Sequence, residues 1–203
     1  MPDSDYFLEL QTQTGWGKVL YRFVDWILPP AGILALDVGC GPGLLPALLG
    51  QVGCRALGVD LSPEMFLPRP LHPGVVVADS LVLPFGTRRF DLVTASNLLF
   101  LLDNPETALR EMARVMRPGG QVAVLNPSEL FSQAAALEFA DQRQLQGLAR
   151  ETLINWGRRA DRHHRWNENQ LRDLLAAAGL RLIQSTTLMG PGFARLARAV
   201  KRA

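Results

Sequence analysis

The chain has 203 residues, of which 48% are hydrophobic, so it can bury a substantial core within one domain of ordinary size. Its 21 basic and 19 acidic residues leave a formal net charge of +2, which is too balanced for general attraction to nucleic acid. No apolar run reaches the length of a membrane span, and the acidic start MPDSD lacks the basic flank of a signal peptide. These features exclude a disordered chain and a disulfide-stapled miniprotein, and they predict a cytoplasmic protein without a membrane span.

The first third of the chain predicts a helical leader followed by a strand-helix-strand unit. Residues 5–28 have the pattern of an amphipathic helix. Residues 33–40 are almost entirely apolar and end in glycines, which is typical of a strand buried on both faces of a parallel sheet. A helix is predicted over 44–53, and a second strand over 54–61 ends in an acid.

The middle of the chain continues the alternation. Residues 74–80 and 90–97 predict two further strands, joined by a loop that needs no helix. A helix over 105–116 has Asn104 as its cap, and residues 119–128 predict the fifth strand. Regular alternation of this kind indicates an open, doubly wound α/β sheet whose ligand lies beyond the carboxyl ends of the strands.

The last third changes character. Residues 129–165 are predicted helical and rich in Ala, Gln, Leu and Arg, and a well-signalled helix ends at Gly179. The two remaining segments are predicted to pair as an antiparallel hairpin around residues 189–192. The expected fold is therefore a seven-stranded, mostly parallel, Rossmann-like sheet in a single domain. Its expected parts are a leader (1–30), a cofactor-binding core (31–128), a helical insertion that forms an acceptor pocket or lid (129–165), and a C-terminal helix with a hairpin (166–203).

The turn after the first strand carries the most specific motif. Gly39, Gly41 and Gly43 occupy every second position between a strand and a helix, where glycine permits positive φ and close approach of a ligand. A dinucleotide fingerprint would need its last glycine at position 44, which is Leu44. Asp37 would repel a pyrophosphate but suits a cationic amino-acid ligand.

This pattern resembles that of the class I S-adenosylmethionine-dependent methyltransferases, particularly the small-molecule branch that includes the ubiquinone and menaquinone methyltransferases. The resemblance is close over residues 33–128 and elsewhere extends only to the order of elements. It implies that the acid-x-Gly-x-Gly-x-Gly motif wraps the methionine part of S-adenosylmethionine, that the acid ending the second strand binds the ribose, and that an acid after the third strand lies near the adenine. The cofactor-binding candidates are Asp37, Gly39, Cys40, Gly41, Gly43, Asp60, Leu61, Asp79, Ser80, Ser96 and Asn97.

Each of these assignments has a structural alternative. The glycine loop could be an ordinary tight turn, Asp60 a helix cap or a solvated strand end, and Asp79 the cap of the next turn. Cys40 and Cys54 are the only cysteines, so neither a disulfide framework nor a four-thiolate zinc site can be built, and no metal is expected.

The insertion supplies the candidates for acceptor recognition. Only two of the 21 basic residues are lysines, and four arginines gather within residues 158–165. Arginine forks would favour an anionic acceptor such as a carboxylate or phosphate, although a solvated helix face is the slightly preferred explanation of the cluster. His163 and His164 are the candidate general bases. The remaining candidates for contacts with the acceptor are Trp16, Tyr21, Asn126, Arg158, Arg159, Arg162, Arg165 and Trp166.

The sequence thus predicts an enzyme that transfers a methyl group from S-adenosylmethionine to a small-molecule acceptor, releasing S-adenosylhomocysteine. Two alternatives remain open at this point. An NAD(P)-dependent oxidoreductase is opposed by Leu44 and Asp37, whereas a non-catalytic regulatory protein that binds S-adenosylmethionine is compatible with the lack of an evident base.

Overall fold

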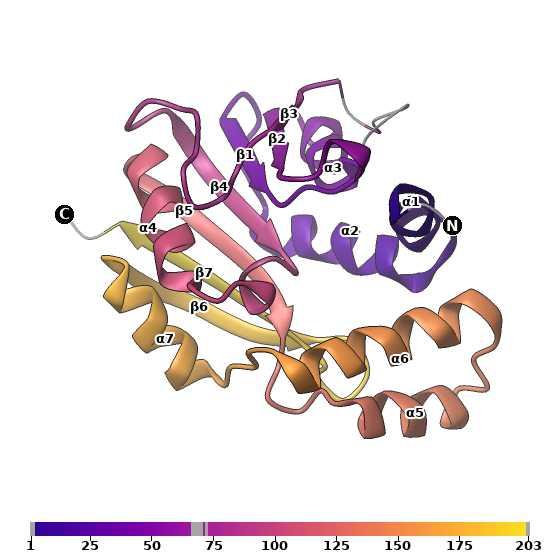
Figure 1. Cartoon of the computed structure of the whole chain (residues 1–203). Coiled ribbons are helices and arrows are strands. Elements are labelled where there is room, and N and C mark those ends of the chain that lie inside the picture. The colour runs from indigo at the N-terminus through magenta and orange to yellow at the C-terminus, as the bar shows by residue number, and fades with distance from the viewer. Residues whose placement is uncertain (1–2, 66–70, 72, 202–203) are drawn as a thin grey trace.

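A mixed sheet runs through the middle of the molecule, with helices on both faces (Figure 1). The computed structural model describes residues 3–65, 71 and 73–201, and the sheet has seven strands within them. The strands are β1 (Leu34–Val38), β2 (Arg55–Asp60), β3 (Val75–Val77), β4 (Phe90–Ser96), β5 (Met116–Pro127), β6 (Leu180–Leu188) and β7 (Ala194–Lys201).

The strand order is β3-β2-β1-β4-β5-β7-β6, and β7 is antiparallel to both of its neighbours while the other pairs are parallel. The chain reverses between β6 and β7 in a tight turn, where Met189 and Gly190 have φ of 68° and 53° and the Gly192 N–H donates to the Met189 carbonyl. The predicted doubly wound sheet with an antiparallel C-terminal hairpin is confirmed.

Two layers of helices cover the sheet. The α-helices are α1 (Asp3–Gln13), α2 (Gly15–Ile27), α3 (Leu44–Gln51), α4 (Pro105–Val115), α5 (Gln133–Gln142), α6 (Gly147–Arg162) and α7 (Glu168–Ala177), and short 3-10 turns are η1 (Pro63–Met65) and η2 (Leu99–Leu101). Helices α2 and α3 bury Phe23 and Leu48 against one face, and α4 and α7 bury Leu109 and Leu175 against the other. None of the described helices is both long enough and apolar enough to cross a membrane.

The leader forms two helices rather than the single continuous one that the pattern over 5–28 suggests. Thr14 ends the first helix and caps the second, because its hydroxyl accepts a hydrogen bond from the Trp16 N–H at 3.1 Å. At Gly17 a Cβ would lie 2.4 Å from the Gln11 carbonyl oxygen, so only glycine allows the two helices to come this close. As a result α1 turns back and also contacts η1 and α6.

The insertion between β5 and α7 contains α5 and α6, which pack on each other around their own apolar cluster. A Cβ at Gly157 would lie 2.7 Å from the Ser132 carbonyl oxygen, so glycine permits the close crossing. In Figure 1 the arrowheads of β4 and β5 point toward the region that α2 and α6 flank. The leader and the insertion therefore face each other beyond the carboxyl ends of these strands.

Several strands differ in length from their predicted ranges; β1, for example, covers five residues of the expected 33–40. The edge strand β3 covers three residues of the expected 74–80, because the chain turns at Asp79, whose side chain accepts a hydrogen bond from the Leu81 N–H. Strand β5 begins at Met116, three residues before the expected 119, and pairs there with Phe90 on β4.

Candidate functional site

The turn between β1 and α3 has the backbone conformation that its glycines allow. Gly39, Gly41 and Gly43 have φ of +73°, +53° and +94°, in the left-handed region that other residues rarely adopt. A Cβ at Gly39 would lie 3.0 Å from the Leu98 side chain. The loop therefore exposes main-chain atoms where a side chain would otherwise stand, and it leaves room for close approach of a ligand.

Cys40 anchors this loop to the sheet. Its thiol packs over β2, where a Cβ at Gly58 would lie 2.7 Å from Sγ. Burial raises the pKa of the Cys40 thiol, and the nearby carboxylates of Asp37 and Asp60 act in the same direction. The thiol stays protonated, so Cys40 takes part in the site through packing and its backbone and not as a nucleophile.

Asp37 is a carboxyl group buried at the end of β1, with a relative exposure of 1%. Strand β4 pairs Thr94 with it, and the Thr94 hydroxyl donates a hydrogen bond of 2.7 Å to Asp37 Oδ1. Burial raises the pKa of Asp37 from 3.8 to about 8; the Thr94 hydrogen bond lowers it, and the charge of Asp60 raises it. Among the residues that the structure describes, no cation pairs with this carboxyl, so a cationic ligand group would compensate for its desolvation.

Asp60 links the end of β2 to the glycine loop. Its Oδ2 accepts a hydrogen bond of 2.8 Å from the Gly41 N–H, and its Oδ1 accepts one of 3.0 Å from the Ser62 N–H. A carboxylate offers about four lone-pair sites, so both oxygens can still accept hydrogen bonds from a ligand's hydroxyl groups. Asp60 thus holds the loop in shape and presents an anionic edge beside it.

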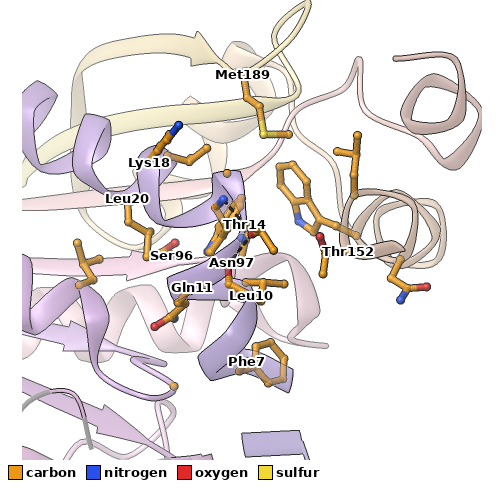
Figure 2. Close-up of a pocket in the computed structure, with 18 of the residues that line it drawn as sticks. Phe7, Leu10, Gln11, Thr14, Lys18, Leu20, Ser96, Asn97, Thr152 and Met189 are labelled. Atoms are coloured by element: carbon orange, nitrogen blue, oxygen red, sulfur yellow. Dashed lines mark hydrogen bonds between the residues drawn. The ribbon is translucent and has the colours of Figure 1, made fainter. Parts of the chain in front are cut away.

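A cavity of about 720 Å³ begins at the glycine loop and continues between the leader and the insertion. Its loop end is lined by Asp37, Gly39, Cys40, Gly41 and Asp60. Figure 2 shows Ser96 and Asn97 beside the leader residues Phe7, Leu10, Gln11 and Thr14, with Met189 and Thr152 on other sides of the space. The walls away from the loop are mostly apolar and include Phe7, Leu10, Trp16, Phe139, Leu153 and Trp156.

Asn97 has the strained backbone that is common where a strand presents a functional side chain. Its φ is +54°, and its N–H donates to the Leu125 carbonyl on β5 at 2.7 Å. Its Oδ1 is buried and has no hydrogen-bond partner in the described part of the chain. A left-handed non-glycine residue with an unpaired polar atom at a cavity is a candidate contact for a ligand.

The charged residues of the lining divide into two groups. The two acids, Asp37 and Asp60, belong to the loop end, whereas the cations Lys18, Arg22 and Arg159 belong to α2 and α6. None of these cations has an ion pair within residues 3–65, 71 and 73–201. No sequence motif singles out Lys18 and Arg22. Their spacing of four places them on one helix face, but only the packing of α2 shows which face lines the cavity.

The four arginines of the insertion do not form one cluster. Arg159 lines the cavity, and its guanidinium lies 6.0 Å from the centre of the Phe7 ring. Arg158 and Arg162 are exposed and do not line the cavity. Arg158 lies about 100° around the helix from residue 159, and Arg162 is the last residue of α6. Arg165 follows α6 and donates to the Phe131 carbonyl at 2.6 Å. Of the four arginines expected to contact the acceptor, the structure therefore places Arg159 alone in the lining of the cavity.

The other acceptor candidates also divide. Trp16 lines the cavity, but Tyr21 is 51% exposed and lies outside the lining. Asn126 is buried, and its Oδ1 accepts a hydrogen bond of 3.3 Å from the Phe100 N–H, which supports η2. Trp166 belongs to the core against α4 and α7. Tyr21 is thus a surface residue, Asn126 supports a turn, and Trp166 packs in the core.

His163 and His164 are not brought to the cavity. Both are exposed because α6 ends at Arg162 and the chain turns away. The His163 ring meets Phe100 edge-on, and the His164 ring stacks on Trp166 with 5.4 Å between the ring centres. Neither histidine belongs to the lining of the cavity, although Phe100, which the His163 ring contacts, does.

Some candidates for cofactor contact lie near the loop end without lining the cavity. These are Gly43, Leu61, Asp79 and Ser80. Gly43 begins α3, Leu61 is 66% exposed, and Asp79 caps the turn after β3. A cluster of three or more His, Cys, Asp or Glu side chains able to hold a metal ion is absent from the described residues.

Comparisons with known proteins agree with this geometry. Residues 36–124 match the family model described as "Methyltransferase domain". The chain is 33% identical over 190 residues to a 2-phytyl-1,4-naphtoquinone methyltransferase of Thermosynechococcus vestitus, covering 82% of this chain and 80% of the relative. It is 33% identical over 114 residues to a ubiquinone biosynthesis O-methyltransferase of Xanthomonas axonopodis pv. citri, covering 51% of this chain and 47% of the relative.

A solved structure has the same fold. The magnesium protoporphyrin IX methyltransferase of Synechocystis PCC 6803, with bound S-adenosylhomocysteine (SAH), superposes with a TM-score of 0.65 at 16% identity. The match covers 93% of this chain and 84% of that one.

Proposed function

Because this chain belongs to the class I S-adenosylmethionine-dependent methyltransferase family, we propose that it methylates a small molecule bound between its leader and its insertion. The observation that carries this proposal is the cavity described above. One end has a glycine loop with two carboxyl groups, and the rest has mostly apolar walls. Such a cavity can hold a charged cofactor and an apolar acceptor side by side.

The residues at the loop end fit S-adenosylmethionine. Its methionine part carries an α-ammonium group, which would compensate for the buried carboxyl of Asp37, and its ribose hydroxyls would donate to Asp60. The glycines at 39 and 41 give it room along the backbone. When bound, S-adenosylmethionine supplies an electrophilic methyl group on its sulfonium. The nicotinamide alternative is set aside, since the relatives reported above are methyltransferases.

The acceptor end suggests an aromatic or otherwise apolar small molecule. The names of these proteins mention a naphthoquinone, ubiquinone and a porphyrin. Each of these molecules has a large apolar ring system or an apolar tail. Here the rings of Phe7, Trp16, Phe139 and Trp156 offer comparable surfaces. We assign residues 1–30 and 129–165 to acceptor binding and residues 31–128 to cofactor binding. The cations Lys18, Arg22 and Arg159 favour an acceptor that also carries a negative group.

The chain contributes alignment more than proton transfer. In the described part of the lining there is no histidine, and the two carboxyl groups lie at the cofactor end. Fixing the acceptor in line with the methyl group and excluding water can supply much of the rate enhancement. The best acceptors should therefore be molecules whose reacting atom is already ionised or strongly nucleophilic.

Calorimetric titration of ligand-free protein tests this function. S-adenosylmethionine and S-adenosylhomocysteine should bind with dissociation constants in the range of about 1–100 μM, a free energy of roughly −8 to −5.5 kcal/mol, and NADH and NADPH should not bind. Binding of the nicotinamides alone, or of none of the four, would overturn the proposal. With binding established, release of S-adenosylhomocysteine on addition of naphthoquinols or phenols reports turnover, and its absence across such a panel would leave only the regulatory alternative.

A further inference from the structure

Trp156 occupies the middle of α6, where the acceptor end of the cavity meets the interior. Its indole lies edge-on to Trp16, with 5.1 Å between ring centres, and tilted against Phe131 at 4.2 Å. It is the one partly buried side chain that packs against all three apolar clusters of the described residues. Contacts on several sides hold the ring in one orientation.

The indole Nε1–H of Trp156 is buried and has no hydrogen-bond partner among the protein groups that the structure describes. Five buried side-chain atoms share this property there, and three of them belong to residues lining the cavity: Gln11, Asn97 and Trp156. An amide can exchange its oxygen and nitrogen by rotating, but an indole N–H can only donate. Leaving such a donor unpaired is unfavourable. Because Trp156 lines the cavity, a molecule bound there can supply the acceptor atom that the described chain does not.

We propose that Trp156 donates a hydrogen bond from Nε1 to an oxygen atom of the methyl acceptor, and that this bond selects oxygen-bearing rings over bare hydrocarbons of the same shape. The inference rests on the proposed function and adds the acceptor's chemical class to it. Apolar neighbours such as Phe7, Leu10 and Leu153 enclose the body of the molecule. The N–H then fixes which edge of the ring turns toward α6, and thus which atom faces the cofactor.

Direct binding measurements separate the hydrogen bond from simple packing. The probes are 1-naphthol and naphthalene, which differ by one hydroxyl group, titrated into protein saturated with S-adenosylhomocysteine. The Trp156→Phe variant keeps an aromatic ring but loses the N–H. It should bind 1-naphthol about tenfold more weakly than the wild type, while the affinity for naphthalene should change by less than about threefold. Trp26→Phe is the matched control, since Trp26 lies against Phe23 and Arg198, outside the cavity lining.

An equal loss for both probes would overturn the proposal, because it would reduce Trp156 to a packing residue. Unchanged binding of 1-naphthol would do the same and would indicate that water satisfies the N–H. Failure of the wild type to bind 1-naphthol would also reject the proposed class of acceptor. The proposed function fails separately, if S-adenosylhomocysteine itself does not bind.

A measurement on the unaltered chain covers the case in which the variant does not fold. The chain has four tryptophans, so nitrogen-15 labelling of their indoles gives a simple spectrum. Addition of 1-naphthol should move the Trp156 indole proton downfield, and naphthalene should not. The signal is assigned by difference with single Phe variants of the other three tryptophans. Equal shifts with both probes would contradict a specific hydrogen bond.

Discussion

The two ends of the cavity are built in opposite ways. The cofactor end comes from residues 37–60, close together in sequence, and depends on backbone conformation, two carboxyl groups and main-chain amides. The acceptor end comes from helices far apart in sequence, 6–22 and 139–159, and depends on the packing of side chains. The first end is rigid and polar, and the second is apolar with cations around it. One scaffold can therefore keep its cofactor chemistry while the acceptor wall changes.

The largest effect is expected from a substitution at the cofactor end of the cavity. Asp37→Asn keeps the size of the side chain but removes a carboxyl group that can ionise when an ammonium group binds beside it. The affinity for S-adenosylhomocysteine, measured by calorimetry, should fall at least about a hundredfold, roughly 2.7 kcal/mol, because the charge-assisted bond to its ammonium group is lost. Naphthalene binding should stay the same. A change of less than about threefold in the affinity for S-adenosylhomocysteine would remove Asp37 from the cofactor site, and Asp103→Asn on the surface is the control.

The raised pKa of Asp37 makes both stability and binding depend on pH. Its carboxyl holds a proton up to about pH 8 in the folded chain but loses it near 3.8 when unfolded, so its contribution to stability is present at low pH and is lost as pH rises through 8. Urea unfolding should therefore show the wild type losing stability relative to Asp37→Asn between about pH 5 and pH 8.

Cofactor binding should respond in the opposite direction. Pairing with an ammonium group requires ionised Asp37, so the affinity for S-adenosylhomocysteine should rise by up to about tenfold per pH unit between about pH 5.5 and pH 7.5. Calorimetry in buffers of different ionisation enthalpy should detect the proton that is released on binding. A flat profile in the wild type, matching that of Asp37→Asn, would contradict the assignment.

Asp60→Ala should have the next largest effect. The affinity for S-adenosylhomocysteine should fall at least about tenfold, roughly 1.4 kcal/mol, as the ribose hydroxyls lose their acceptor. Since Asp60 also accepts from the Gly41 and Ser62 amides, the free energy of unfolding should fall by about 1–2 kcal/mol as well. The Asp60→Asn variant keeps one carbonyl oxygen, so its affinity for S-adenosylhomocysteine should lie between those of the wild type and of Asp60→Ala. An unchanged affinity for the cofactor product would limit Asp60 to holding the loop.

The smallest effect is expected from a substitution of the exposed Arg159 at the acceptor end of the cavity. Arg159→Gln should weaken binding of 1-hydroxy-2-naphthoic acid about threefold to fivefold, because an exposed guanidinium is screened by solvent. The loss should shrink in high salt, and the affinity for S-adenosylhomocysteine should not change. Arg162→Gln, on the same helix but outside the lining, is the matched control. Equal effects of the two variants would attribute the loss to general charge.

The difference between the two ends also explains which parts could be predicted from the sequence. The glycine loop, Asp37 and Asp60 lie within one strand-turn-helix-strand segment, where spacing along the chain fixes spacing in space. The order of the elements followed from the alternation of buried strands with amphipathic helices, although the short edge strand β3 was predicted too long.

The acceptor wall required the tertiary structure. Which of Arg158 and Arg159 faces the cavity depends on how α6 rotates against α5, and Gly157 permits that crossing. The place of Gln11, Lys18 and the other leader residues depends on the break at Thr14, which turns α1 back over the site.

By itself, then, the sequence determined the sheet, the glycine loop and the two cofactor-end carboxyl groups, because these depend on backbone propensities and short separations along the chain. Only the tertiary structure decided that Arg159, Lys18 and Trp156 share a cavity while His163, Tyr21 and Arg165 do not. The physical reason is that helix-helix crossings arise from contacts between distant segments, and no local pattern records which face of each helix will be buried.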